Sequence, residues 1–417
     1  MIVTGLILGL LALFGAPLFA IIAASAMWAY YREDIDVSAI AIEFFSIAEM
    51  PVLLAIPLFT FAGYLLSESQ APSRLVRLTQ ALLGWMPGGL AIVSLAACAF
   101  FTAFTGASGV TIIALGAILF PALAQAGYGD KFNLGLVTSA GSLGLLFAPS
   151  LPLILYGIVA QVPIDSLFRA GILPGMLMLI MLAGYSLWVN RGTSQPLSQF
   201  SWQEVRGALR ESVWELPLPV VVLGGIYSGY FAVSEAAAVT ALYALIVEVF
   251  ILREIPLKRV PDIMRESMLL VGGILVILGV SLASTNIMID SGVPQRLLEW
   301  VSSFVTGQAS FLILLLLFLL VLGAILDIFS ALVLVVPLIL PVALEYGIEP
   351  VHLGIVFLAA MQLGYLTPPV GLNLFIASYR FEKPITEVYA ATFPFLVILL
   401  LSVVIITFWP ALSLVFL

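Results

Sequence analysis

The chain carries a weak copy of its first half within its second half, and the two copies coincide at helix-breaking residues. Moving the sequence by 220 positions superimposes Pro121 and Pro341, Gly127 and Gly347, Gly144 and Gly364, Pro149 and Pro369, and Pro174 and Pro394. At slightly larger shifts, Pro163 meets Pro384, and the pair Pro72 and Arg74 meets Pro294 and Arg296. Repeated apolar segments with such interruptions are typical of secondary transporters, which bind their cargo between two repeats.

The composition places the chain in a membrane. Of its 417 residues 63% are hydrophobic and 9% are charged, whereas a soluble domain has about 25% charged residues. The mean hydropathy is +1.21. Three long windows carry no charged residue: those between Arg77 and Asp130, between Lys131 and Asp165, and between Glu349 and Arg380. Each holds one or two stretches of about 20 apolar residues, the length that crosses a bilayer. We therefore predict an all-α polytopic membrane protein.

The residue inventory argues against an enzyme. One histidine, one cysteine and no HExxH motif leave little from which to build a nucleophile–base pair or a metal site. No glycine-rich phosphate-binding loop with a lysine is present, so ATP is not expected to drive the protein directly. The net charge of −8 gives no sign of a nucleic-acid partner. Carboxylates are almost absent from the apolar stretches, which favours sodium over a proton relay as the coupling ion.

Loop charges give the two halves opposite orientations. The positive-inside rule makes the two basic stretches in the middle of the chain cytoplasmic. They carry Arg191, Arg206, Arg210, Arg253, Lys258, Arg259 and Arg265. Residues 32–36, the first-half counterpart of the second stretch, hold one basic and three acidic groups and are expected outside. The loop with Arg74 and Arg77 is expected inside and its net acidic counterpart, residues 290–299, outside. We predict two inverted-topology repeats, with both termini external.

These patterns predict a division of the chain into three parts. The first repeat covers residues 1–190, with scaffold helices at about 1–85 and a hairpin and broken helix at about 86–160. A cytoplasmic linker covers residues 191–215, and its Ser201–Glu204 segment resembles a capping box. It forms either an amphipathic helix at the membrane interface or an ordinary solvated helix. The second repeat covers 216–417, with a scaffold at about 216–305 and a hairpin and broken helix at about 306–380.

Each repeat contains a segment too long for one straight crossing. Residues 311–344 include one charge, Asp327, and as a single helix they would measure roughly 50 Å against a core of about 30 Å. A re-entrant hairpin that turns at Asp327–Ser330 resolves the mismatch. The first-half equivalent, residues 88–123, turns at Thr105–Thr111. The N–H groups at the start of each second half-helix would form an anion site.

A second break follows each hairpin at matching distance, at Gly144–Pro152 and at Gly364–Asn373. Proline frees a backbone carbonyl of the preceding turn, and such a carbonyl near hydroxyl groups can bind sodium. The alternative is a pair of kinks selected for packing. We expect one sodium site in each repeat, with Ser108 and Gly144 in the first and Asp327, Ser330, Gly364 and Thr367 in the second. Thr105, Gly106, Thr111, Pro149 and Asn373 complete the candidate sodium and substrate residues.

Several of these residues have simpler alternative roles. Asp327 can be the N-cap of the second half-helix, a role compatible with ion binding. Ser108, Thr111 and Ser330 can cap a helix or bond back to helix carbonyls, which is the commoner fate of such residues. Their position at the hairpin tips is what favours a function.

Two segments resemble signature sequences of the large membrane subunit of tripartite ATP-independent periplasmic (TRAP) transporters, the DctM family. They are Gly224–Val239 and Thr367–Phe375, and the likeness extends over the whole chain. One departure is Ala232-Val-Ser234, where the family pattern leads us to expect Thr-Pro-Thr.

The resemblance implies an elevator-type fold and sodium-driven import in the bacterial inner membrane, with no cofactor besides sodium as the coupling ion. A periplasmic substrate-binding protein would deliver a small organic acid or zwitterion. A small four-helix membrane subunit of the DctQ type and membrane lipid would be the other partners. The alternative is a stand-alone sodium-coupled dicarboxylate transporter that needs no binding protein.

Overall fold

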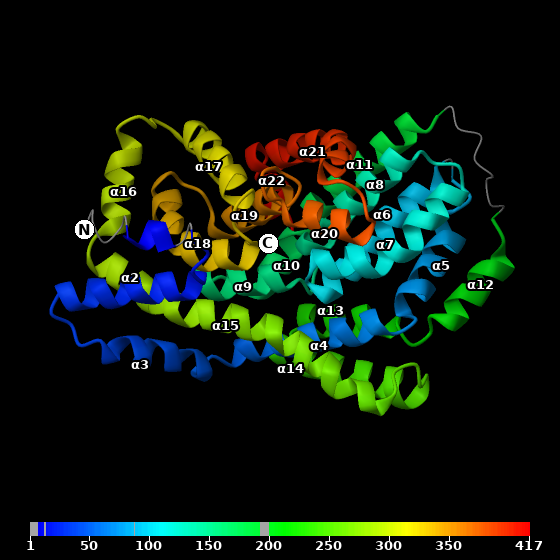
Figure 1. Cartoon of the computed structure of the whole chain (residues 1–417), viewed down its shortest axis with the longest axis horizontal. Coiled ribbons are helices and arrows are strands. Elements are labelled where there is room, and N and C mark those ends of the chain that lie inside the picture. Colours follow the sequence, from blue (N-terminus) through cyan, green and yellow to red (C-terminus); the bar gives the residue numbers. More distant parts are fainter. Residues whose placement is uncertain (1–6, 12–13, 87, 192–199) are drawn as a thin grey trace.

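The computed structural model describes residues 7–11, 14–86, 88–191 and 200–417, and every regular element among them is helical. The helices form two layers (Figure 1). Long helices lie side by side along one edge and form a scaffold: α2 (Leu18–Arg32), α3 (Ser38–Ser46), α4 (Ala55–Glu68), α14 (Val233–Leu245) and α15 (Val260–Asp290), with the shorter α13 (Pro217–Tyr227) against α14. Most of the remaining helices form a compact block above them in this view, with α16 (Val293–Ser302) at one end of the molecule and α12 (Trp202–Glu211) at the other.

The block contains the two predicted hairpins and the two predicted broken helices. The first hairpin is α6 (Gly89–Thr105) and α7 (Ser108–Gln125), and the second is α17 (Gln308–Gly323) and α18 (Ile328–Glu345). The first broken helix comprises α8 (Asp130–Ala140), η3 (Leu143–Leu146) and α9 (Leu151–Ala160). The second comprises α19 (Pro350–Gly364) and α20 (Leu372–Arg380). The sequence therefore located both turns and both breaks correctly.

The same order of elements occurs twice, which confirms the repeat. Each hairpin is preceded by a short amphipathic helix, α5 (Ala71–Leu83) in the first half and α16 (Val293–Ser302) in the second. Each broken helix is followed by a long apolar segment: α10 (Ile164–Ala170) with α11 (Ile172–Val189), or α21 (Ile385–Phe408), which the short α22 (Ala411–Leu414) follows. Within the described residues, seven helices are long and apolar enough to cross a membrane, and the pair 130–146 and 151–160, bent by 42°, can form an eighth span. The chain is an all-α multi-pass membrane protein.

Two glycines show the repeat at the level of single atoms. A Cβ added at Gly144 would lie 2.3 Å from the Ala99 carbonyl oxygen and 2.5 Å from the Ala103 nitrogen, both on α6. A Cβ added at Gly364 would lie 2.4 Å from the carbonyl carbon of Gly323 on α17. Since Gly323 is 220 positions after Ala103, each broken helix touches its own hairpin at the same place.

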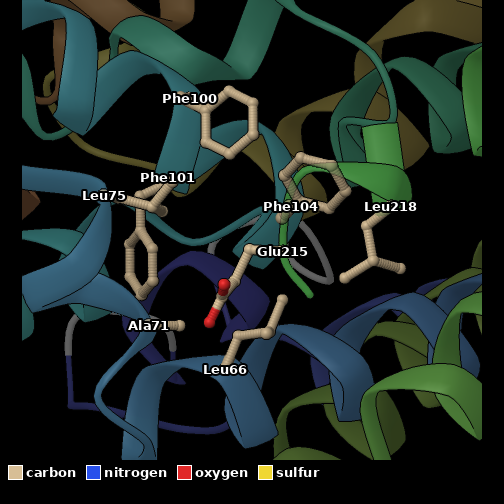
Figure 2. A pocket seen from close by; sticks show the side chains of 8 residues that line it. All are labelled: Leu66, Ala71, Leu75, Phe100, Phe101, Phe104, Glu215 and Leu218. Atoms are coloured by element: carbon tan, nitrogen blue, oxygen red, sulfur yellow. The ribbon is translucent and has the colours of Figure 1, made fainter. Parts of the chain in front are cut away.

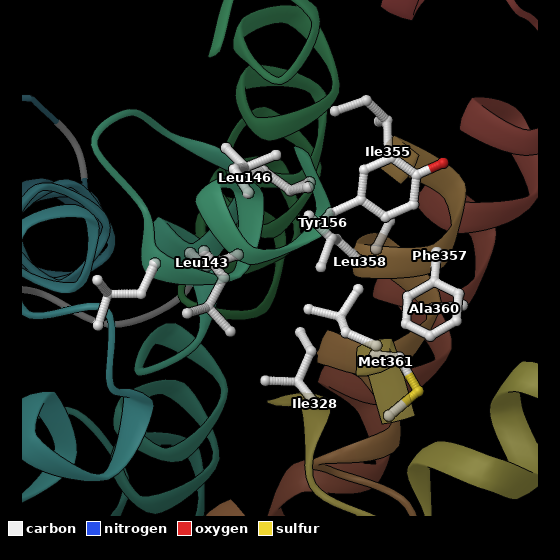
Figure 3. Close-up of a cluster of buried hydrophobic side chains, with 14 of the residues drawn as sticks. Leu143, Leu146, Tyr156, Ile328, Ile355, Phe357, Leu358, Ala360 and Met361 are labelled. Carbon is white, nitrogen blue, oxygen red and sulfur yellow. The ribbon is translucent and has the colours of Figure 1, made fainter. Parts of the chain in front are cut away.

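The core of the block lies between the two broken helices. Leu143, Leu146 and Tyr156 from the first face Ile355 and Leu358 from the second (Figure 3), and all five are essentially inaccessible to solvent. The Tyr156 hydroxyl donates to the Pro350 carbonyl at 2.6 Å. The polar group of the largest buried side chain is thereby satisfied, and the bond joins the broken helices of the two repeats.

The linker forms helix α12 (Trp202–Glu211), which begins with the predicted cap: the Ser201 hydroxyl accepts from the Glu204 N–H at 3.4 Å. The helix lies against α5 with Val205 and Ala208 buried, while Trp202 is exposed. Arg77 on α5 pairs with Glu204 at 2.9 Å and with Glu211. Residues 192–199 of the predicted linker lie outside the described residues.

Candidate transport site

The tip of the first hairpin lies over the start of α9. Helix α6 ends at Thr105, and Gly106 adopts a left-handed conformation with φ of 63°. A Cβ at Gly106 would lie 2.5 Å from Cγ of Leu151, the first residue of α9. Both the backbone conformation and the close approach require glycine here. The chain then enters α7 at Ser108.

Ser108 connects the first repeat to the second. Its hydroxyl donates to the side-chain oxygen of Asn373 at 2.7 Å, and Asn373 lies in the first turn of α20, just beyond the second break. The Asn373 amide nitrogen lies 3.5 Å from the carbonyl of Thr138 on α8. All three residues are buried. The hairpin tip of one repeat therefore meets the broken helices of both.

A cluster of oxygen atoms without full charge lies next to this contact. The hydroxyls of Thr102 and Thr111 are 2.7 Å apart. The Thr102 hydroxyl also lies 2.7 Å from the Cys98 carbonyl of its own helix and 2.9 Å from the Gly141 carbonyl. Gly144 lies against Thr102, not against the tip itself. The described residues contain no group of three His, Cys, Asp or Glu side chains that could hold a metal. Hydroxyl and carbonyl oxygens at an unwound helix are the ligands that transporters offer to sodium.

The tip of the second hairpin is satisfied internally. One Asp327 carboxylate oxygen accepts from the N–H groups of Phe329 and Ser330 at 2.9 and 3.0 Å, and the other accepts from the Ser330 hydroxyl. The Tyr365 hydroxyl accepts from the Ile328 N–H at 3.1 Å. Asp327 is therefore the N-cap of α18. The first N–H groups of this helix already have acceptors, in contrast to α7, whose N-cap Ala107 makes no side-chain bond.

The second break is more exposed than the first. The Thr367 hydroxyl donates to the Leu363 carbonyl at 3.1 Å, and Thr367 is half-buried. Asp327 is exposed, whereas Ser330 and Gly364 are buried. At the first break, Gly144 and Pro149 are both buried. Each break contains a cis X–Pro bond, Ala148–Pro149 and Pro368–Pro369.

The structure groups the sequence-predicted residues differently from the expected pairing of each tip with its own break. Ser108 contacts Asn373 of the other repeat, Thr111 contacts Thr102, and Thr105 remains local, with its hydroxyl 3.5 Å from the Ala107 carbonyl. The sequence did not identify four residues that make polar contacts in this region, namely Thr102, Thr138, Gly141 and Tyr365. Two had a signal in the sequence, since Thr102 lies one turn before Thr105 and Gly141 one turn before Gly144.

Comparisons with known proteins agree with this architecture. Residues 4–412 match the family model for the DctM component of the tripartite ATP-independent periplasmic transporter. The C4-dicarboxylate TRAP transporter large permease protein DctM of Pseudomonas aeruginosa is 34% identical over 91% of this chain and 89% of its own length. The ectoine/5-hydroxyectoine TRAP transporter large permease protein UehC of Ruegeria pomeroyi is 33% identical over 87% of this chain and 85% of its own length.

A solved structure shares the fold. The Alcanivorax borkumensis YdaH transporter, described as having an unusual topology, superimposes with a TM-score of 0.57 over 90% of this chain and 88% of that one. The sequence identity is 16%.

Proposed function

Since this chain belongs to the DctM family of tripartite ATP-independent periplasmic transporters, we propose that it imports a small carboxylate-bearing anion or zwitterion by symport with sodium. Its place would be the bacterial inner membrane. The family membership confirms the resemblance seen in the sequence, and the two relatives described above are named as transporter permeases.

The hydrogen bond between Ser108 and Asn373 is the observation that carries the proposal. It places the hydroxyl group of one repeat's hairpin tip against the amide of the other repeat's broken helix. The Thr102, Thr111 and Gly141 oxygens lie in the same hairpin and break. A buried site of neutral oxygens between two repeats suits a monovalent cation bound together with an anion.

The start of α7 is the proposed position of the substrate carboxylate. Its first N–H groups have no side-chain cap, and the helix dipole favours negative charge at this end. The equivalent N–H groups of α18 already donate hydrogen bonds to Asp327 and Tyr365. C4-dicarboxylates and ectoines, which the names of the two relatives mention, share a carboxylate group. We therefore place a carboxylate near Ser108 and sodium beside it.

An elevator movement of the block against the scaffold is the proposed transport step. The scaffold helix α4 touches the hairpin tip where Gly63 faces Thr105: a Cβ at Gly63 would lie 2.7 Å from the Thr105 Cα. A small-residue contact between helices allows close approach without an interlocking side chain. A periplasmic binding protein and a small four-helix membrane subunit are the proposed partners, in keeping with the word tripartite in the family description.

Reconstitution in proteoliposomes with both partners tests the proposal. Uptake should follow an imposed sodium gradient and persist when the proton gradient is collapsed. Ser108→Ala and Thr367→Ala should raise the sodium concentration for half-maximal uptake several-fold, since a lost hydrogen-bonding group is worth about 0.5–1.5 kcal/mol. Ser94→Ala is the matched control because Ser94 lies within α6, away from the hairpin tips and the breaks, and its hydroxyl bonds only to the Leu90 carbonyl of its own helix.

Three results would count against the proposal. Undiminished uptake in sodium-free buffer would refute the proposal that sodium is the coupling ion. Wild-type sodium dependence in both variants would refute the assigned sites. Saturable high-affinity uptake by the chain alone would favour a stand-alone transporter.

A further inference from the structure

A single arginine on α5 holds three glutamates from three different segments. Arg74 pairs with Glu215, at the end of the linker, at 2.5 Å. It pairs also with Glu254, in the loop before α15, and more distantly with Glu248 at 3.7 Å. Glu248 belongs to a π-helical segment, Ile246–Ile251, that continues α14. π-Helical turns occur frequently at functional positions.

The charges of this cluster do not balance. Three carboxylates face one guanidinium, and Arg74 is the only basic residue paired with any of them among the described residues. The side chain of Glu248 is 0% exposed and that of Glu215 is 4% exposed. A buried carboxylate without a cation is strongly disfavoured because water no longer solvates its charge. One carboxylate is therefore in excess of what Arg74 and solvent can stabilise.

Glu248 is the carboxylate least stabilised as an anion. Neither of its oxygens accepts a hydrogen bond among the described residues, and the neighbouring Ser69 hydroxyl donates to the Leu66 carbonyl at 3.0 Å. Arg74, in contrast, donates hydrogen bonds to Glu215 and Glu254. Glu254 also accepts from the Gln70 N–H at 2.7 Å. Glu248 thus lies at the edge of the guanidinium, fully buried and aimed at a cluster that is already negative.

Glu215 shows the apolar character of this region. Its carboxylate points into a pocket lined by Leu66, Leu75, Phe104 and Leu218 (Figure 2). Burial raises the pKa of Glu215, and the neighbouring charge of Arg74 opposes the shift. The two carboxylates buried most deeply therefore compete for one guanidinium in a medium of low polarity.

Other groups near Glu248 do not supply the missing positive charge. Tyr243, on α14, donates its hydroxyl to the Trp214 carbonyl. Helix α4 packs along α14 and carries Tyr64 and Glu68, and Glu68 pairs with Arg259 at 3.5 Å. Within the described residues no three acidic, histidine or cysteine side chains are placed to hold a metal. A proton is the ligand that fits a fully buried carboxylate of this kind.

We infer that the Arg74 cluster is a proton-binding site and that Glu248 holds the proton at neutral pH. When Glu248 carries this proton, Arg74 pairs with Glu215 and Glu254 alone. The cluster then has one buried negative charge fewer. Arg296, the counterpart of Arg74 in the second repeat, is exposed and donates to the Ser291 carbonyl at 2.9 Å. The cluster around Arg74 therefore has no counterpart around Arg296. It is separate from the proposed sodium and substrate site, which rests on the paired hairpins.

The site connects α5, which leads into the first hairpin, to the linker and the scaffold. Release of the proton would add a negative charge between these three segments. A carboxyl group that keeps its proton in the folded protein binds that proton more tightly than the unfolded chain does. The stability that the bound proton contributes is complete at acidic pH, declines once the unfolded chain ionises, and is fully lost when the folded protein also releases the proton at alkaline pH.

Thermal unfolding of the full-length protein, purified in detergent and measured from acidic to alkaline pH, tests the inference. Glu248→Gln imitates a protonated glutamic acid in the folded and the unfolded chain, so its midpoint should equal that of the wild type at acidic pH and lie at or above it at neutral pH. The alkaline decline of the wild type should be lost in this variant. Glu254→Gln is the control, because it removes an ionised partner of Arg74 and should lower the midpoint by several degrees at neutral pH. Infrared spectra at neutral pH should show a protonated-carboxyl C=O band that Glu248→Gln lacks.

Three outcomes would overturn the inference. Glu248→Gln could lower the midpoint at neutral pH as much as Glu254→Gln does, or it could retain the alkaline decline of the wild type. Failure of Glu248→Gln to accumulate as a folded protein would have the same meaning, because glutamine and protonated glutamic acid are nearly alike in shape and polarity.

Discussion

The contact between each broken helix and its hairpin leads to a prediction for Gly144→Ala and Gly364→Ala. The added Cβ would lie 2.3 Å from the Ala99 oxygen in the first case and 2.4 Å from the Gly323 carbonyl carbon in the second, whereas ordinary contacts begin at 3.4 Å. Both obstacles are backbone atoms, which cannot rotate away as a side chain can. The two helices must therefore separate by about 1 Å, an overpacking that costs about 1–3 kcal/mol.

Two other glycines provide matched controls for this prediction. Gly184 on α11 and Gly224 on α13 lie within helices, and an added Cβ at either would meet no atom within 4 Å. Alanine is favoured over glycine in a helix by about 1 kcal/mol. Gly184→Ala and Gly224→Ala should therefore be neutral or slightly stabilising, which separates the effect of contact from the effect of the substitution itself.

Thermal unfolding of the purified variants, followed by tryptophan fluorescence, is the assay. A change of 1 kcal/mol corresponds to about 2 °C or less in a chain of this length. Gly144→Ala and Gly364→Ala should therefore unfold below the wild type by up to about 6 °C, and the two controls at or slightly above it. Equal midpoints for all four variants would refute the reasoning, since the broken helices would then not be held against the hairpins as described.

Three further predictions concern named polar groups. Arg74→Ala should lower the free energy of unfolding by about 3–5 kcal/mol, because it leaves buried carboxylates without a cation. Arg77→Ala removes only exposed ion pairs and should lower it by less than about 1 kcal/mol. Thermal unfolding midpoints of the two variants test this difference. Asp327→Ala loses the helix cap and should lower stability by about 0.5–2 kcal/mol. Asp327→Asn keeps the cap and should still raise the sodium concentration for half-maximal uptake. A wild-type sodium requirement in Asp327→Asn would show that Asp327 acts only as a cap. Asn373→Ala leaves the buried Ser108 hydroxyl unpaired, at a cost of about 1–3 kcal/mol, and should impair uptake more than Ser94→Ala does.

The sequence determined the elements of this protein because the signals that define them are local. Proline and glycine interrupt a helix wherever they occur, and an aspartate before an apolar run caps one. The turn of the second hairpin was therefore predicted at Asp327, which is the N-cap of α18. The 220-position repeat fixed the first hairpin and both breaks in the same way.

The tertiary structure alone decided which elements meet. Ser108 and Asn373 are 265 positions apart, and Arg74 collects glutamates from three separate segments. In a soluble helix the apolar face marks the side that packs, but in a membrane both the lipid-facing and the buried faces are apolar. The sequence of α17 is apolar all round, for example, yet Gly323 contacts Gly364 while Leu317 is exposed. Hydrophobic pattern therefore could not pair the helices, and close contacts between distant backbones and buried polar groups selected the arrangement.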